Sequence, residues 1–253
     1  MFESIPVATA VVVAATFVLA GAVKGVIGLG LPTVSLAILT VALGLPEAMA
    51  LLLVPSFATN LWQALVGPHR RSVLRRLWPF LVMAAATVWL GAGALTRVDL
   101  SLLSALLGAL LVTYAAVSLA GFRFTVSPRQ EVWAGPVFGA INGVLTGMTG
   151  SFVVPGVMYL QALGLSRDML IEAMGVLFTV STLALAAGLH GNGLLTVELG
   201  SLSVAALVPA ILGMVIGQRI RSGLSEVLFR RVFFAGLLIL GAYIVLNALR
   251  NAA

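Results

Sequence analysis

A single lysine is the residue of this sequence with the clearest capacity for chemistry. Lys24 is the only lysine of the chain, and it lies inside the glycine-rich stretch 21–30. A charge inside an apolar segment is energetically expensive, so it indicates a function by default. The ammonium suits an anionic substrate. Two alternatives stay open: the lysine snorkels to the membrane surface, or it pairs structurally with an acidic residue.

A second glycine-rich stretch, 139–151, carries amide and hydroxyl side chains in place of the ammonium. Glycines beside proline, serine or threonine are typical of broken membrane helices, whose free backbone N–H groups favour an anion. The same glycines could instead permit close helix packing, which is the alternative. The residues that we expect to bind substrate are Lys24, Gly25, Gly28, Gly30, Thr33, Asn60, Asn142, Gly143, Thr146, Gly147, Thr149, Gly150 and Ser151.

Few other polar groups could take part. Glu172 is a candidate proton-coupling carboxylate, although acids near a helix start also serve as caps or neutralise a neighbouring arginine. The residues Ser56, Thr59, Asn60 and Gln63 share one helical face by their spacing. They line a pathway or bond to neighbouring helices, and the sequence does not decide between the two.

Catalytic and metal-binding motifs are not evident. The chain has no cysteine, which excludes disulfides and thiol chemistry. Its two histidines, His69 and His190, fall in predicted loops on opposite sides of the membrane. We therefore expect a protein that is not an enzyme and that needs no cofactor and no metal.

The elements that must position these residues are membrane helices. Of 253 residues, 61% are apolar and 9% are charged, and the mean hydropathy is +1.16. Uncharged runs of 20 residues or more follow Arg76, Asp99, Glu172 and Glu198. A helix of about 20 apolar residues spans a bilayer, so each run predicts one crossing. The fold class expected is all-α and polytopic, with about eight long or medium helices and two short ones.

The net charge of +6 reflects membrane topology and not nucleic-acid binding. The arginines gather in two short clusters between apolar spans, as the positive-inside rule predicts. We expect a multi-pass protein of the bacterial inner (cytoplasmic) membrane with both termini periplasmic. Its expected partners are the lipid bilayer and a small anion, homo-oligomerisation being left open. The two clusters are Arg70, Arg71, Arg75, Arg76 and Arg219, Arg221, Arg230, Arg231.

The sequence contains an internal duplication. Residues 21–28 align with 139–146, and residues 42–49 align with 162–169, at offsets of 118 and 120. We predict a first transmembrane repeat at 1–121, a cytoplasmic linker at 122–131 and a second transmembrane repeat at 132–253. Each repeat is expected to hold a broken-helix hairpin followed by three transmembrane helices.

The lengths of the uncharged runs predict where the helices are broken. The 35 uncharged residues between Glu131 and Arg167 are too many for one crossing and too few for two. This pattern predicts helical arms at 132–147 and 152–164 around a break at 146–151. In the first repeat it predicts a break at 25–30 and a short helix at 32–42.

The loop charges predict that the two repeats have opposite orientations. The loop 67–76 is rich in arginine, whereas its counterpart 188–195 has none. The next pair of loops reverses this bias, which is the signature of inverted-topology repeats.

The stretch from Gly21 to Gly30, its second copy from Gly139 to Gly150 and the paired Ala-Leu-Gly-Leu segments resemble the TauE/SafE family of sulfite and sulfonate exporters. The resemblance covers nearly the whole chain. It implies export of a small oxyanion such as sulfite, a sulfonate or a sulfocarboxylate, linked to the proton gradient.

The hypothesis is therefore a secondary transporter whose two hairpin tips meet near the membrane midplane around an anion. A passive anion channel would use the same broken helices with a continuous pore. An integral-membrane enzyme acting on a lipid is a third alternative.

Overall fold

The computed structural model describes residues 6–122 and 124–252. Every regular element of these residues is helical, which confirms the all-α prediction. The elements in chain order are α1 (Val7–Ile27), α2 (Leu31–Leu43), α3 (Leu45–Leu51), α4 (Leu53–Val66), α5 (Arg70–Ala86), α6 (Val88–Ala92), η1 (Gly93–Thr96), α7 (Leu100–Ala120), α8 (Pro128–Thr149), η2 (Val153–Val157), α9 (Met158–Ala162), α10 (Arg167–Gly191), α11 (Val197–Ile220), η3 (Arg221–Gly223) and α12 (Glu226–Ala252).

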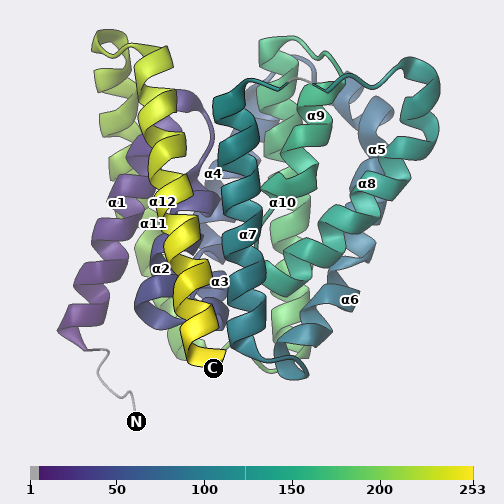
Figure 1. The fold of residues 1–253 in the computed structure, drawn as a ribbon. Helices are drawn as coiled ribbons and strands as arrows, with labels where there is room; N and C mark the ends of the chain where they lie inside the picture. Colours follow the sequence, from purple (N-terminus) through teal and green to yellow (C-terminus); the bar gives the residue numbers. More distant parts are fainter. Residues whose placement is uncertain (1–5, 123, 253) are drawn as a thin grey trace.

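Six helical segments of the described residues are long and apolar enough to cross a membrane. Helices α3 and α4 are together also long and apolar enough, with a bend of 44° between them. The helices α2 and η2–α9 are shorter and fold back beside α1 and α8 (Figure 1). The chain is thus a multi-pass integral membrane protein, and α1 begins at the end of the bundle where α12 finishes (Figure 1).

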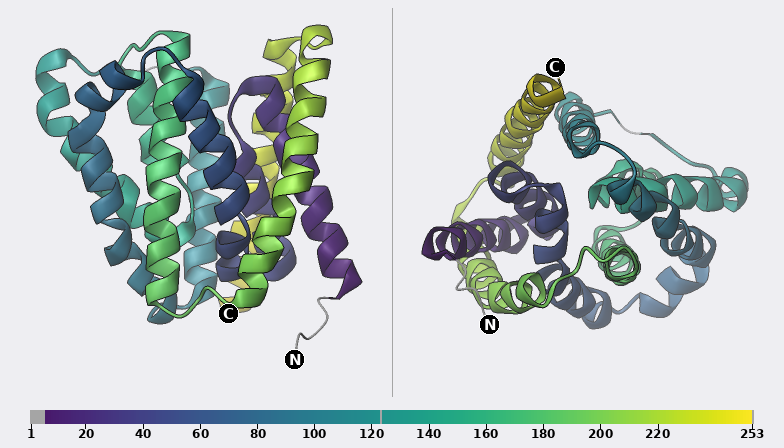
Figure 2. Two further views of the ribbon diagram at one scale, coloured as in Figure 1. Left: turned by 180° about the vertical axis from the view of Figure 1, so that it is seen from behind. Right: turned by 90° about the horizontal axis from the view of Figure 1, so that it is seen from below.

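Each broken helix packs against the other half of the chain. Figure 2 shows α1 beside α11 on one side of the bundle and α8 beside α5 on the other. Helices α4 and α10 contact each other between these pairs, and α7 lies along α12. If each helix is replaced by its counterpart in the other half of the chain, the same pairs of neighbouring helices result. The packing therefore supports two inverted repeats, while the boundaries at 121 and 132 stay predictions.

The glycine contacts give the register of the two halves. A Cβ on Gly21 would meet the carbonyl of Ala210, and one on Gly143 would meet the carbonyl of Ala84. Gly25 faces Met214 in the same way that Gly147 faces Val88. The equivalent residues of α1 and α8 are thus 122 residues apart, one helical turn beyond the predicted offset of 118.

The breaks are also shorter than predicted. Helix α1 runs through Gly25 and ends at Gly28, whose φ of 79° is left-handed and whose N–H donates to the Lys24 carbonyl at 2.7 Å. Helix α8 ends in the same way at Gly150, with a φ of 72° and a 2.7 Å bond to the Thr146 carbonyl. Because glycine adopts positive φ without steric cost, it ends both helices. By this geometry the counterpart of Lys24 is Thr146 and not Asn142.

Candidate functional site

Lys24 forms the α1 end of a buried polar cluster. Its side chain is 4% exposed and donates to Thr59 Oγ1 at 3.2 Å and to Asn60 Oδ1. Asn60 Nδ2 in turn donates to Ser56 Oγ at 3.1 Å. Ser56 Oγ and Thr182 Oγ1 are 3.2 Å apart. The cluster therefore runs from α1 through α4 to α10, and it crosses from one half of the chain to the other.

Among the described residues, the Lys24 ammonium bonds to neutral oxygens and to no carboxylate. The two ion pairs that these residues form are Arg76–Glu131 and Arg167–Glu226, and neither includes Lys24. Structural pairing of Lys24 with an acid, one of the sequence-based alternatives, is thus not found there. Snorkelling is not found either, because the ammonium is buried against α4.

Several of the predicted binding glycines pack helices together. A Cβ on Gly25 would clash with backbone atoms of α11, and a Cβ on Gly143 or Gly147 would clash with α5 or α6. Helices can approach this closely only where both surfaces carry small residues. Gly25, Gly143 and Gly147 therefore serve helix packing, which was the alternative interpretation.

The glycines at the breaks have a different role. Gly28, Gly30 and Gly150 all adopt positive φ, at 79°, 107° and 72°. Gly30 precedes the first residue of α2, and the buried Thr33 lies in the first turn of that helix. These residues form the turns that separate the long helices from the short ones.

The second break is surrounded by polar side chains, and only some of their hydrogen-bonding groups have partners. Thr146 Oγ1 donates to the Ser151 carbonyl at 2.9 Å, and Thr149 Oγ1 donates to the Leu145 carbonyl at 2.7 Å. Asn142 Oδ1 accepts from the Gly156 N–H at 2.9 Å. Asn142 Nδ2 and Ser151 Oγ are buried and have no hydrogen-bond partner. A buried donor without a partner indicates a ligand, a water or a strained site.

Ser181 of α10 carries another buried polar group without a partner, although the sequence-based site did not include this residue. Its hydroxyl is fully buried and unpaired. No sequence signal distinguishes Ser181 from the other hydroxyl residues of this helix, because a serine in an apolar helix does not show which neighbour it faces.

The two breaks do not face each other. A Cβ on Gly28 would meet Ile171 at 3.9 Å, whereas one on Gly150 would meet Met49 at 2.7 Å. Met49 and Ile171 are both near the start of their helices, α3 and α10, which begin at opposite ends of the bundle (Figure 1). The prediction that the tips meet needs this correction: the polar residues form two groups on either side of the α4–α10 contact.

Glu172 lies apart from Lys24, at the start of α10. Its Oε2 accepts from the His69 N–H at 2.8 Å, and its carboxylate fills the space beside Gly67. The side chain is 1% exposed, and its Oε1 has no partner. Glu172 therefore anchors the loop between α4 and α5 and keeps one free carboxyl oxygen.

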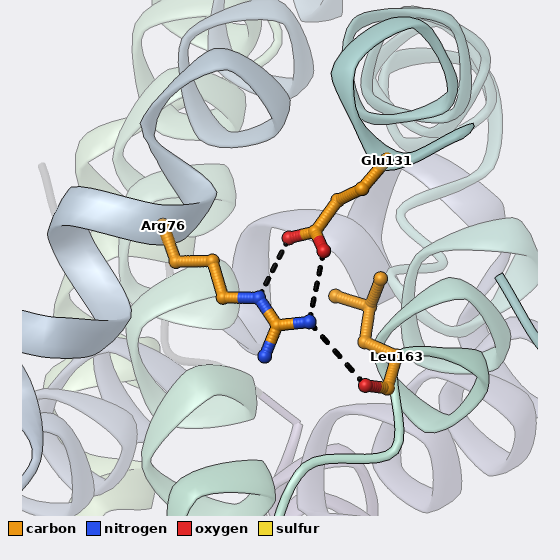
Figure 3. Close-up of polar contacts among 3 residues, drawn as sticks. All are labelled: Arg76, Glu131 and Leu163. Atoms are coloured by element: carbon orange, nitrogen blue, oxygen red, sulfur yellow. Dashed lines mark hydrogen bonds and ion pairs between the residues drawn. The ribbon is translucent and has the colours of Figure 1, made fainter. Parts of the chain in front are cut away.

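A bidentate ion pair joins helices at the arginine-rich end of the bundle. Arg76 of α5 donates to both carboxylate oxygens of Glu131 of α8, at 2.7 and 2.8 Å (Figure 3). The same guanidinium reaches the carbonyl of Leu163, after α9, at 3.4 Å (Figure 3). This fork geometry fixes orientation as well as charge, so it holds the second hairpin against α5.

The comparison with protein families gives one result that covers this whole arrangement. A family model described as "Sulfite exporter TauE/SafE" matches residues 13–244, which include both breaks, Lys24 and the α4–α10 contact. Neither the search of curated proteins nor the search of solved structures returns a match.

Proposed function

The chain belongs to the sulfite exporter TauE/SafE family of membrane transporters, and from this premise we propose that it is a secondary exporter of a small sulfur oxyanion. Sulfite, a sulfonate and a sulfocarboxylate are the candidate substrates. The family accounts for transport of a sulfur anion across a membrane, and the residues described above suggest how this chain would do so.

The observation that carries the proposal is the buried Lys24 ammonium without a carboxylate. An ion that is buried without a partner of opposite charge costs several kcal/mol. Lys24 has three N–H donors, of which two are used by Thr59 and Asn60. The third donor and the uncompensated charge suit an oxyanion, which would supply the missing counter-charge.

The duplicated packing supports alternating access. In inverted repeats, the two halves can exchange two near-equivalent arrangements around a central site. Here the site would lie at the α4–α10 contact, with Lys24 on one side and Asn142, Thr146 and Ser151 on the other. The Ser56–Thr182 contact links the two sides and would be remade as the halves exchange roles.

Orientation and coupling are further parts of the proposal. The arginine-rich loops would face the cytoplasm of a bacterial cell, with both termini in the periplasm. Glu172 is the candidate for proton coupling, because it is a buried carboxyl with one unpaired oxygen at the arginine-rich end of the bundle.

The experiment is sulfite flux in proteoliposomes with Lys24→Met, which keeps the length of the side chain and removes its charge. Thr16→Val is the matched control, because Thr16 is buried on the same helix two turns away. We expect Lys24→Met to abolish saturable flux and sulfite-dependent thermal stabilisation, while Thr16→Val keeps both. Unchanged sulfite flux in Lys24→Met would refute the proposal. Flux without saturation or counterflow would indicate a channel.

A further inference from the structure

Two cavities lie at opposite ends of the seam between α7 and α12. The first, of about 620 Å³, is lined by the end of α7, by the segment 158–165 and by Arg230. The second, of about 370 Å³, is lined by the end of α2, the start of α7 and the end of α12, with Ser104 on its wall. We call them the Arg230 mouth and the Ser104 mouth.

The two mouths occupy equivalent positions of the inverted repeats. Asp99 caps the start of α7 and Ser225 caps the start of α12, and these caps are 126 residues apart. At this offset Ser104 corresponds to Arg230, and Ile244 of the Ser104 mouth corresponds to Ser118 of the Arg230 mouth. The mouths therefore differ in chemistry while they share their place in the fold.

That difference is mainly one of charge. The Ser104 mouth carries the acidic residue Glu47 and no basic residue among those that line it. The Arg230 mouth carries a guanidinium, the amide of Gln161 and the hydroxyls of Ser118 and Thr125. One mouth thus attracts anions and the other repels them.

Arg230 forms no ion pair with an acidic residue among the described residues. Glu226 lies one turn away on α12, but it bonds to Arg167 of α10 at 3.2 Å instead. The guanidinium carbon of Arg230 lies 6.0 Å from the ring centroid of Phe234, which leaves its N–H groups available. A planar guanidinium with free donors is well suited to oxyanions.

The space beside Arg230 extends toward the end of the helix that carries Lys24. A smaller cavity of about 110 Å³ shares Arg230 and Gln161 with the large one, and Ile27 and Leu29 form part of its wall. These two residues flank Gly28, which ends the helix that carries Lys24. An anion held by Arg230 would therefore lie at the entrance to the first break.

We propose that Arg230 and Gln161 form an anion-capture site at this mouth, and that the difference between Arg230 and Ser104 favours loading of the transporter from the arginine-rich side. The ligand is a small oxyanion. The inference rests on the proposed function, since it assigns the loading step of the same transport cycle. A charged entrance raises the local concentration and the association rate of an oppositely charged ligand.

The test is Arg230→Ser, with sulfite presented separately at each face in inside-out and right-side-out membrane vesicles. Arg231→Ser is the matched control: it removes the same charge one residue away, and Arg231 lines none of the three cavities. We expect Arg230→Ser to raise KM about 3- to 10-fold at the arginine-rich face only, with kcat unchanged, and the effect to shrink as ionic strength rises. Arg231→Ser should alter KM less than twofold.

The exchange variant Arg230→Ser/Ser104→Arg makes the test sharper. It should move the lower KM to the opposite face, because it transfers the guanidinium to the equivalent mouth. Equal KM values at both faces in the wild-type protein, or an equal loss in Arg230→Ser and Arg231→Ser, would overturn the inference and leave the proposed function standing. Absence of any saturable sulfite flux in the wild-type protein would instead refute the proposed function.

A lipid headgroup is the other source of the same anionic chemistry. Proteoliposomes made only of zwitterionic phosphatidylcholine separate the two sources. If Arg230 captures free anions, the effect of Arg230→Ser persists in these vesicles. If the effect vanishes there and returns with phosphatidylglycerol, Arg230 serves lipid contact and the inference fails.

Discussion

Replacing Asn60 by Asp places a carboxylate beside the Lys24 ammonium with almost no change in volume. Asn60 Oδ1 already accepts from Lys24, so the new carboxylate would take over this bond and supply the missing counter-charge from within the protein. Asn60→Asp should therefore inhibit binding of the substrate by imitating it.

The magnitude follows from the geometry of the ammonium. Two acceptors held by different N–H groups of one ammonium lie about 4.7 Å apart when each N···O distance is about 2.9 Å. With an effective dielectric constant of about 20, two negative charges at that separation repel by about 3.5 kcal/mol. A free energy of this size corresponds to a loss of affinity of roughly 400-fold.

The assay is sulfite-dependent thermal stabilisation and counterflow in detergent and in proteoliposomes. Without sulfite, Asn60→Asp should unfold at a temperature no lower than the wild-type protein, because the new ion pair offsets the desolvation of the carboxylate. Asn192→Asp makes the same chemical change after α10, far from Lys24, and should leave affinity unchanged. Affinity within fivefold of the wild-type value in Asn60→Asp would refute the assignment of Lys24 as the anion ligand.

Three further experiments test the packing, the coupling and the link between the halves. In thermal unfolding, Gly147→Ala should lower the free energy of unfolding by about 1–3 kcal/mol, because a Cβ at this position meets α6. The control Gly93→Ala has open space around its Cβ and should change the free energy of unfolding by less than about 0.5 kcal/mol. Equal effects of the two substitutions would contradict the packing described for Gly147. Glu172→Gln should keep sulfite exchange but lose acceleration by a pH gradient in proteoliposomes, and retention of that acceleration would leave Glu172 as a loop anchor only. A double-mutant cycle of Ser56→Ala and Thr182→Val should give a coupling of about 0.5–1.5 kcal/mol in unfolding experiments, and additivity would show that the contact does not link the halves.

Hydropathy and charge were sufficient to predict the helical, multi-pass fold. Uncharged runs such as the one between Asp99 and Arg123 became single helices, here α7. This succeeds because the bilayer imposes both the length and the composition of a span. The packing neighbours also follow the predicted inversion, as the equivalent pairs α1–α11 and α8–α5 show.

The register of the duplication could not be predicted from the same signals. Gly139, Gly143 and Gly147 recur at every fourth residue, so a shift of one helical turn aligns them with Gly21 and Gly25 almost as well. Backbone conformation removes the ambiguity, because α1 ends at Gly28 and α8 ends at Gly150, both with positive φ, which fixes the offset between the two helices. A sequence pattern that repeats with the period of the helix cannot distinguish one turn from the next.

The candidate site was predicted in part. Lys24 and Asn60 were both selected and are bonded to each other, because charged and amide side chains are rare enough in membrane segments to be conspicuous. Ser181 was missed, since a serine in a long apolar helix gives no sign of which neighbour it faces. The rotation of α10 about its own axis decides that, and it depends on packing across both halves.

The packing of α1 on α11 has a consequence for the synthesis of the protein. Roughly 170 residues separate the end of α1 from the start of α11, so at about 5–20 residues per second the ribosome needs about 10–30 s to deliver the partner. During that time α1 waits in the membrane with its small-residue face uncovered. Helix α1 therefore reaches its main packing partner only late in synthesis, whereas the bonds of Lys24 to Thr59 and Asn60 can form as soon as α4 has been inserted.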